Sequence, residues 1–229
     1  MTISILAYDE KTGRYGGAAT TGSLCVGGWV LRGDAEAGMS ASQGSLPSTM
    51  WGTEVLTWMQ SGRSAKDAVD TVTSADSGRA QRQLAALDLN GGTASFTGAE
   101  SIPAAGARSA RHVIVAGNLL QSEHVLQAAL SGFLSSEADL DLRLLDALDA
   151  AVKVGGDSRG VLSAALLVVD RTAAPLTLRI DHSESPMAEL RALHKRATTG
   201  DYADWAATVP TLKDPERAIA YVAKPDPPS

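Results

Sequence analysis

The stretch G-G-D-S-R-G-V-L-S-A-A-L-L-V-V-D, residues Gly155–Asp170, decides the fold that we predict for this chain. Its second half, Ser163–Val169, is a short uncharged run of small and apolar residues, which is typical of a strand buried on both faces. Its first half is a glycine-rich turn that carries Asp157 and Arg159. Because glycines allow a sharp turn and a close backbone approach, these two charged residues are either a candidate site or a local ion pair.

Strands and helices occur in groups on both sides of this stretch. Asp139–Val154 places leucines and alanines on one face and aspartates off it, which predicts an amphipathic helix. Thr2–Tyr8 alternates, so Ile3 and Ile5 share one face of a predicted strand. The same reasoning predicts strands over Tyr15–Thr21, Gly27–Leu31, Ala35–Ser42, Gln83–Leu89, Thr93–Thr97, His112–Ala116 and Leu176–Ile180, and helices over Trp51–Gln60, Ser64–Thr73, Ser122–Leu134 and Met187–Arg196.

Grouped strands followed by grouped helices indicate an α+β protein rather than an alternating parallel sheet. Two antiparallel sheets stacked face to face, each covered outside by a helix pair, would bury every apolar face. We therefore predict a four-layer α-β-β-α sandwich over residues 1–197. Residues 198–229 form a predicted C-terminal extension, with a short helix around Glu216–Tyr221 and a frayed proline-rich end.

Composition narrows the classes of function. The chain has 229 residues, a net charge of −6 and no basic block, which argues against a nucleic-acid surface. No apolar run is long enough to cross a bilayer, so we expect no membrane association. Cys25 is the single cysteine and the four histidines show no ligand spacing. We therefore expect a cytoplasmic protein without a metal or a cofactor. Whether it forms a homodimer is left open.

Several short motifs together resemble one family. They are the opening M-T-I-S-I-L-A-Y-D-x-x-T-G-x-x-G, S-Q at Ser42-Gln43, A-G-N ending at Asn118, G-G-D-S-R-G, and R-I-D-H ending at His182. In combination they resemble DUF1028, a family of unestablished reaction grouped with the N-terminal nucleophile (Ntn) hydrolases. The resemblance covers residues 2 to about 195. It implies the same four-layer sandwich and a hydrolase that acts on an amide bond.

In an Ntn hydrolase the first residue of the mature chain is both nucleophile and base. Removal of Met1 would expose Thr2, whose hydroxyl attacks while its own α-amine takes the proton. A free α-amine titrates near pH ~8, so much of it is a neutral base at physiological pH. Thr2 is otherwise simply the first β-branched residue of a strand. Ser4, which shares its face, is the fallback nucleophile but needs a separate base.

Other candidate site residues lie at strand ends and in loops. Asn118 follows a glycine at the end of a strand, where it is either an oxyanion donor or a polar cap. Gln43 and its neighbour Ser42 are candidates for orienting a substrate amide. Asp157 is a third catalytic candidate and Arg159 a further substrate contact. The expected partner is a small-molecule or peptide substrate.

Two alternatives to an Ntn amidohydrolase remain open at this stage. The first is a catalytically silent sandwich that binds a small ligand in the same pocket. The second is a non-Ntn enzyme that uses the Asp157 and Arg159 turn. Both differ from the first hypothesis in requiring no free amine at Thr2.

Overall fold

The structure, a computed structural model, describes residues 2–221. Its larger sheet has six strands, all antiparallel to their neighbours. The spatial order of the strands is β10 (Leu176–Ile180), β9 (Ser163–Val169), β2 (Arg14–Thr21), β1 (Thr2–Asp9), β8 (Val113–Asn118) and β7 (Gly106–Ala110). The predicted strands at the start of the chain and at Ser163–Val169 thus belong to one sheet, on either side of β2.

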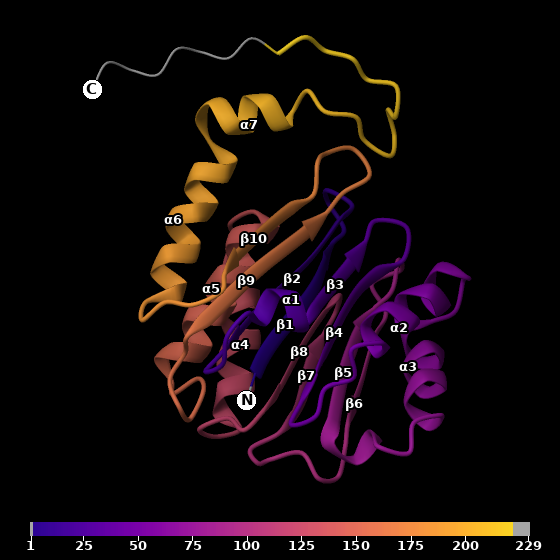
Figure 1. The fold of residues 1–229 in the computed structure, drawn as a ribbon, viewed down its shortest axis with the longest axis vertical. Helices are drawn as coiled ribbons and strands as arrows, with labels where there is room; N and C mark the ends of the chain where they lie inside the picture. The colour runs from indigo at the N-terminus through magenta and orange to yellow at the C-terminus, as the bar shows by residue number, and fades with distance from the viewer. Residues whose placement is uncertain (1, 222–229) are drawn as a thin grey trace.

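The smaller sheet has four antiparallel strands and faces the larger one (Figure 1). Its order is β3 (Leu31–Asp34), β4 (Gly38–Gly44), β5 (Arg82–Leu87) and β6 (Thr93–Thr97). Strands β1 and β2 contact β4, and β8 contacts β5, so the sheets share a core. The α+β class and the two antiparallel sheets are confirmed.

Helices cover the outer faces of both sheets (Figure 1). Helices α4 (His124–Ser135) and α5 (Leu140–Lys153) contact the six-stranded sheet, while α2 (Trp51–Gln60) and α3 (Ala65–Ser74) contact the four-stranded one. Helix α6 (Pro186–Thr198) packs on β9 and β10 and leads into α7 (Gly200–Ala206). A short α1 (Val26–Trp29) and a 3-10 turn, η1 (Arg79–Gln81), complete the described elements. None of these helices is long and apolar enough to span a membrane.

Strand alternation divides the apolar residues between these interfaces. On β1, Ile3 and Ile5 point toward the core beneath α4 and α5, whereas Leu6 points between the sheets. Each such side chain is fully buried and contributes roughly 1.5–3 kcal/mol of transfer free energy. Helix α3 begins as predicted, because the Ser64 hydroxyl accepts a hydrogen bond from the Asp67 N–H at 3.1 Å.

Two predicted elements differ from the structure, and two strands, β3 and β7, were not predicted. Gly27–Leu31 is mostly helix α1 rather than a strand, and its two adjacent glycines have little strand propensity. Position 27 requires glycine, because a β-carbon there would lie 2.7 Å from Ala165 and from Arg179. The predicted helix at Glu216–Tyr221 is wrong: this segment is not helical, and the extension's helix is α7. Strand β7 was not predicted, since its five residues lack an alternating pattern. The proline-rich end lies outside the described residues.

Candidate active site

One end of the core between the sheets is polar. Along β1 the residues that face the smaller sheet run from Leu6, in the apolar core, through buried Ser4 to Thr2. Strand register puts further polar residues beside Thr2, since directly opposed residues share a face. They are Asn118 opposite Thr2, Thr21 opposite Ser163, and Gln43 opposite Gln83. The result is a polar layer contributed by both sheets.

Gln83 is the fully buried centre of this layer, and its surroundings fix the orientation of three side-chain amides. Its Nε2 donates to the carbonyl oxygens of Gly117 at 2.9 Å and Gly106 at 3.1 Å. Because carbonyls only accept, the Gln83 Oε1 must face the other way, and it accepts from Gln43 Nε2 at 2.7 Å and Asn118 Nδ2 at 3.1 Å. Two backbone carbonyls thereby determine which atoms Gln43 and Asn118 present.

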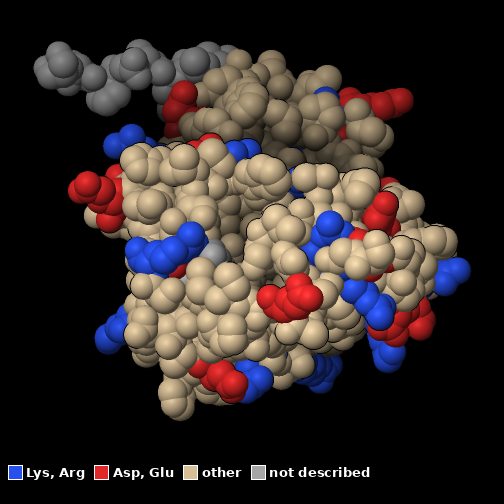
Figure 2. Space-filling model, turned by 60° about the horizontal axis from the view of Figure 1, so that its bottom comes forward, with Lys and Arg blue, Asp and Glu red and all other residues tan. Residues whose placement is uncertain are grey.

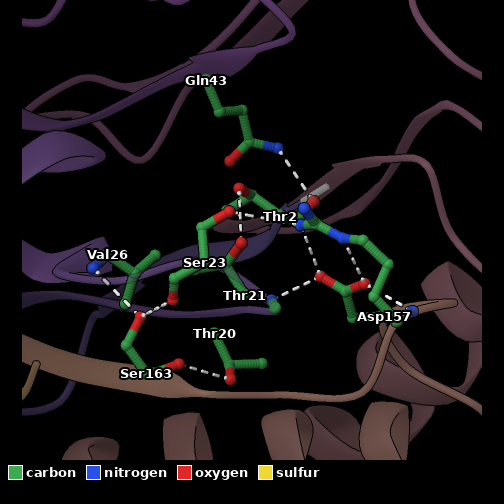
Figure 3. A network of polar contacts seen from close by, with 10 residues as sticks. Thr2, Thr20, Thr21, Ser23, Val26, Gln43, Asp157 and Ser163 are labelled. Carbon is green, nitrogen blue, oxygen red and sulfur yellow. Dashed lines mark hydrogen bonds and ion pairs between the residues drawn. The ribbon is translucent and has the colours of Figure 1, made fainter. Parts of the chain in front are cut away.

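Thr2 begins β1 at the edge of this layer (Figure 3). Its hydroxyl donates to the Thr21 hydroxyl at 3.3 Å, and its carbonyl oxygen lies 3.4 Å from Gln43 Nε2. Gln43 Oε1 is buried and has no donor among the described residues. Gln43 therefore holds the main chain of Thr2 on one side while Thr21 contacts its hydroxyl on the other.

A cavity of about 620 Å³ opens over Thr2. Thr2, Thr21 and Gln43 supply its polar side. Two segments supply the walls: residues 23–30 after β2, which include α1, and residues 44–49 at the end of β4. Figure 2 shows a hollow in one face of the molecule whose border is mostly uncharged. Such a concave site with a few convergent polar groups is the usual form of a small-molecule site.

Ser163 fastens the first of these segments. Its hydroxyl donates to the carbonyl oxygen of Ser23 at 2.8 Å and accepts from the Val26 N–H at 3.2 Å (Figure 3). Ser163 is fully buried, so both bonds lie out of competition with water. The first residue of β9, in the stretch that decides the fold, thus also shapes the cavity wall.

Asp157 fastens the same segment from the other side. Its buried carboxylate accepts from the Gly22 N–H and, at 2.8 Å, from the Arg159 N–H. The Arg159 guanidinium lies 3.2 Å from the carboxylate and 3.3 Å from the Ser23 hydroxyl. Asp157 is not among the described residues that line the cavity, so its geometry is that of a positioning residue. Arg159 does not line the cavity among the described residues, but it contacts Ser23, which does.

The chain is similar to known proteins in both sequence and structure. A family model described as a family of unknown function, DUF1028, matches residues 2–190. The chain belongs to the DUF1028 family. A DUF1028 protein from Silicibacter pomeroyi, known from a crystal structure, is 53% identical, and the two structures align with a TM-score of 0.92 over 96% of this chain and 99% of that one. Among curated proteins, none matches the chain.

Two residues predicted to contact the substrate of this DUF1028 protein, Ser42 and Asn118, do not line the cavity. Ser42 faces away from the cavity, because neighbouring residues of a strand point to opposite sides, and its buried hydroxyl donates to the Ser48 carbonyl at 2.9 Å. Asn118 is opposite Thr2 but does not line the cavity, and its amide donates to Gln83. Ser42 thus holds a loop, and Asn118 supports the layer beneath Thr2.

Sequence reasoning missed Gln83, Thr21 and Ser163. A signal was present for each, since all three are polar residues at positions where the strand otherwise presents small or apolar residues to the same core. The described residues contain no group of three or more metal-ligating side chains.

Proposed function

We propose that this DUF1028 protein is an N-terminal-nucleophile amidohydrolase with Thr2 as its nucleophile. The observation that carries the proposal is the position of Thr2: it begins a central strand, lines the cavity, and has its carbonyl oxygen 3.4 Å from Gln43 Nε2 and its hydroxyl 3.3 Å from that of Thr21. A mature chain that begins at Thr2 would place an α-amine beside the hydroxyl on the cavity floor. A hydroxyl with an adjacent amine is an activated nucleophile within one residue.

The arrangement of helices and sheets supports this proposal. Outer helices α4 and α5 cover one sheet, α2 and α3 cover the other, and the sheets face each other. We propose that this is the four-layer α-β-β-α sandwich of Ntn hydrolases. In that arrangement the nucleophile starts a strand at the polar end of the intersheet core, which is where Thr2 lies.

The reaction would proceed in two balanced steps. The Thr2 oxygen attacks the amide carbonyl carbon and its proton passes to the α-amine. The resulting ammonium protonates the leaving nitrogen, so the C–N bond breaks and an acyl ester of Thr2 remains. Water then attacks this ester, with the α-amine again as base, and releases a carboxylic acid.

Main-chain donors near Thr2 are suited to the oxyanion. Ser23 and Leu24 both line the cavity. Their backbone N–H groups donate no hydrogen bond to another of the described residues. Each well-placed donor of this kind contributes about 3 to 4 kcal/mol to transition-state stabilisation. Asn118 would act indirectly, through Gln83 and Gln43, by keeping the Thr2 main chain in place.

The test combines intact mass with activity. Protein purified from cells is expected to begin at Thr2, and a panel of simple amides is expected to include a substrate. Thr2→Ala should lower turnover at least about a thousandfold, Thr2→Ser should retain activity, and Thr57→Ala, which removes an exposed threonine hydroxyl on α2, should have no effect. Full turnover in Thr2→Ala, or in protein that retains a residue before Thr2, would reject the mechanism.

A further inference from the structure

The mouth of the cavity differs in chemistry from its floor. Leu24, Trp29 and Leu46 all line the cavity, yet their exposed fractions are 56%, 53% and 58%. Leu24 lies between β2 and α1, Trp29 is the last residue of α1, and Leu46 belongs to the loop after β4. Large apolar side chains therefore meet solvent on both walls of one opening, which we call the apolar rim. Exposed apolar groups gathered at a concave site mark a binding surface.

The charges near the rim are already neutralised. Arg82 is the only charged residue among the described residues that line the cavity. Its guanidinium pairs with Asp76 and donates to the Leu46 carbonyl at 2.9 Å. Arg159, which reaches the cavity through Ser23, pairs with Asp157. A charged group of a ligand would therefore lose water at the rim without gaining an uncommitted partner among these side chains.

From this division we infer that the site takes neutral amides with an extended alkyl or aromatic group on one side of the amide bond, and that this group occupies the apolar rim. The inference rests on the proposed function, because it places the amide bond at Thr2. The cavity sets the direction in which the substrate lies. Its polar floor of Thr2, Thr21 and Gln43 faces the amide, and the apolar part of the substrate extends outward between Leu46 and Trp29.

The prediction can be tested by binding, without turnover. In Thr2→Ala protein, the primary amide hexanamide should bind about tenfold more tightly than acetamide, since four added methylene groups are partly buried. The succinyl amide, of similar length but charged, should bind no better than acetamide. A second pair, N-methyl- and N-hexylacetamide, tests the other side of the amide bond. A preference for the longer chain in either pair supports the rim.

Variants of the apolar rim test where the alkyl chain binds. Trp29→Ala and Leu46→Ala should each remove most of the hexanoyl or hexyl preference, whereas Ile102→Ala, which truncates an exposed apolar side chain that does not line the cavity, should keep it. Equal binding of short and long chains in both pairs, tight binding of the succinyl amide, or a preference untouched by both rim variants would overturn the inference. These outcomes are separate from those for Thr2: tight apolar binding without hydrolysis rejects only the hydrolase, and hydrolysis without apolar preference rejects only the rim.

Discussion

Replacing Gln83 by methionine tests the buried amide layer directly. Methionine has a similar length but no hydrogen-bond donor, so the change removes every polar bond of the side chain while filling most of its volume. Three of those bonds are fully buried: to the Gly117 carbonyl, from Gln43 and from Asn118. Each partner left unsatisfied in the core costs about 1–2 kcal/mol, so the free energy of unfolding should fall by about 3–6 kcal/mol.

The measurement is equilibrium unfolding in urea. For an m-value of about 3 kcal/mol/M, the midpoint should drop by about 1–2 M with little change in slope. Gln127→Met is the matched control, because Gln127 is exposed on α4 and its amide bonds only to Ser131 among the described residues. That variant should stay within about 0.5 kcal/mol of the wild type.

Comparison of the two variants tests whether Gln83 is the hydrogen-bonded centre of the polar layer. If Gln83→Met is no more destabilising than Gln127→Met, Gln83 is not the bonded centre of the layer, and the orientation of the three amides must be abandoned. A large loss of stability in Gln83→Met, with recovery of part of it in Gln83→Glu only at acid pH, would agree with the donor that the Gly117 and Gly106 carbonyls require, because only a protonated carboxyl can donate while both of its forms accept from Gln43 and Asn118.

Two further predictions concern stability elsewhere. Burial opposes ionisation of Asp141, but its 2.6 Å bond to His194 and the charge of that ring outweigh burial and lower the Asp141 pKa. Since the folded pKa of Asp141 lies below the unfolded value, the stabilisation is complete above about pH 4 and fades as pH falls. Between pH 5 and 2.5 the urea midpoint should therefore fall more for the wild type than for Asp141→Asn. Parallel curves for the two proteins would contradict this. Gly38→Ala should cost at least about 2 kcal/mol, because φ is +110° and the new β-carbon would lie 2.1 Å from the Leu87 carbonyl oxygen. Gly13→Ala, with φ +76° and open space, should cost less in the same unfolding assay, and equal losses would show that the Leu87 contact is unimportant.

The sequence contains enough local information to predict most elements. Alternation in Thr2–Tyr8 and the uncharged run Ser163–Val169 identify two strands of the larger sheet, and the structure has both. Ser64 predicts the start of α3 because an N-cap acts on its own first turn. Local pattern fails at Gly27–Leu31, where the structure has α1 in place of the predicted strand and Gly27 packs closely against Ala165.

The candidate site shows the same division. Alternation alone requires Ser42 and Gln43 to face opposite sides of β4, but only the position of the other sheet decides that Gln43 meets Thr2 while Ser42 turns toward Ser48. Likewise, the glycine-rich turn already pairs Asp157 with Arg159 in sequence, yet the bond from Gly22 joins residues 135 positions apart. Such contacts depend on strand order and register, which side-chain pattern within one segment does not specify. Local pattern therefore predicts most of the strands and which of their residues share a face, whereas the packing of the two sheets decides which polar faces meet at Thr2.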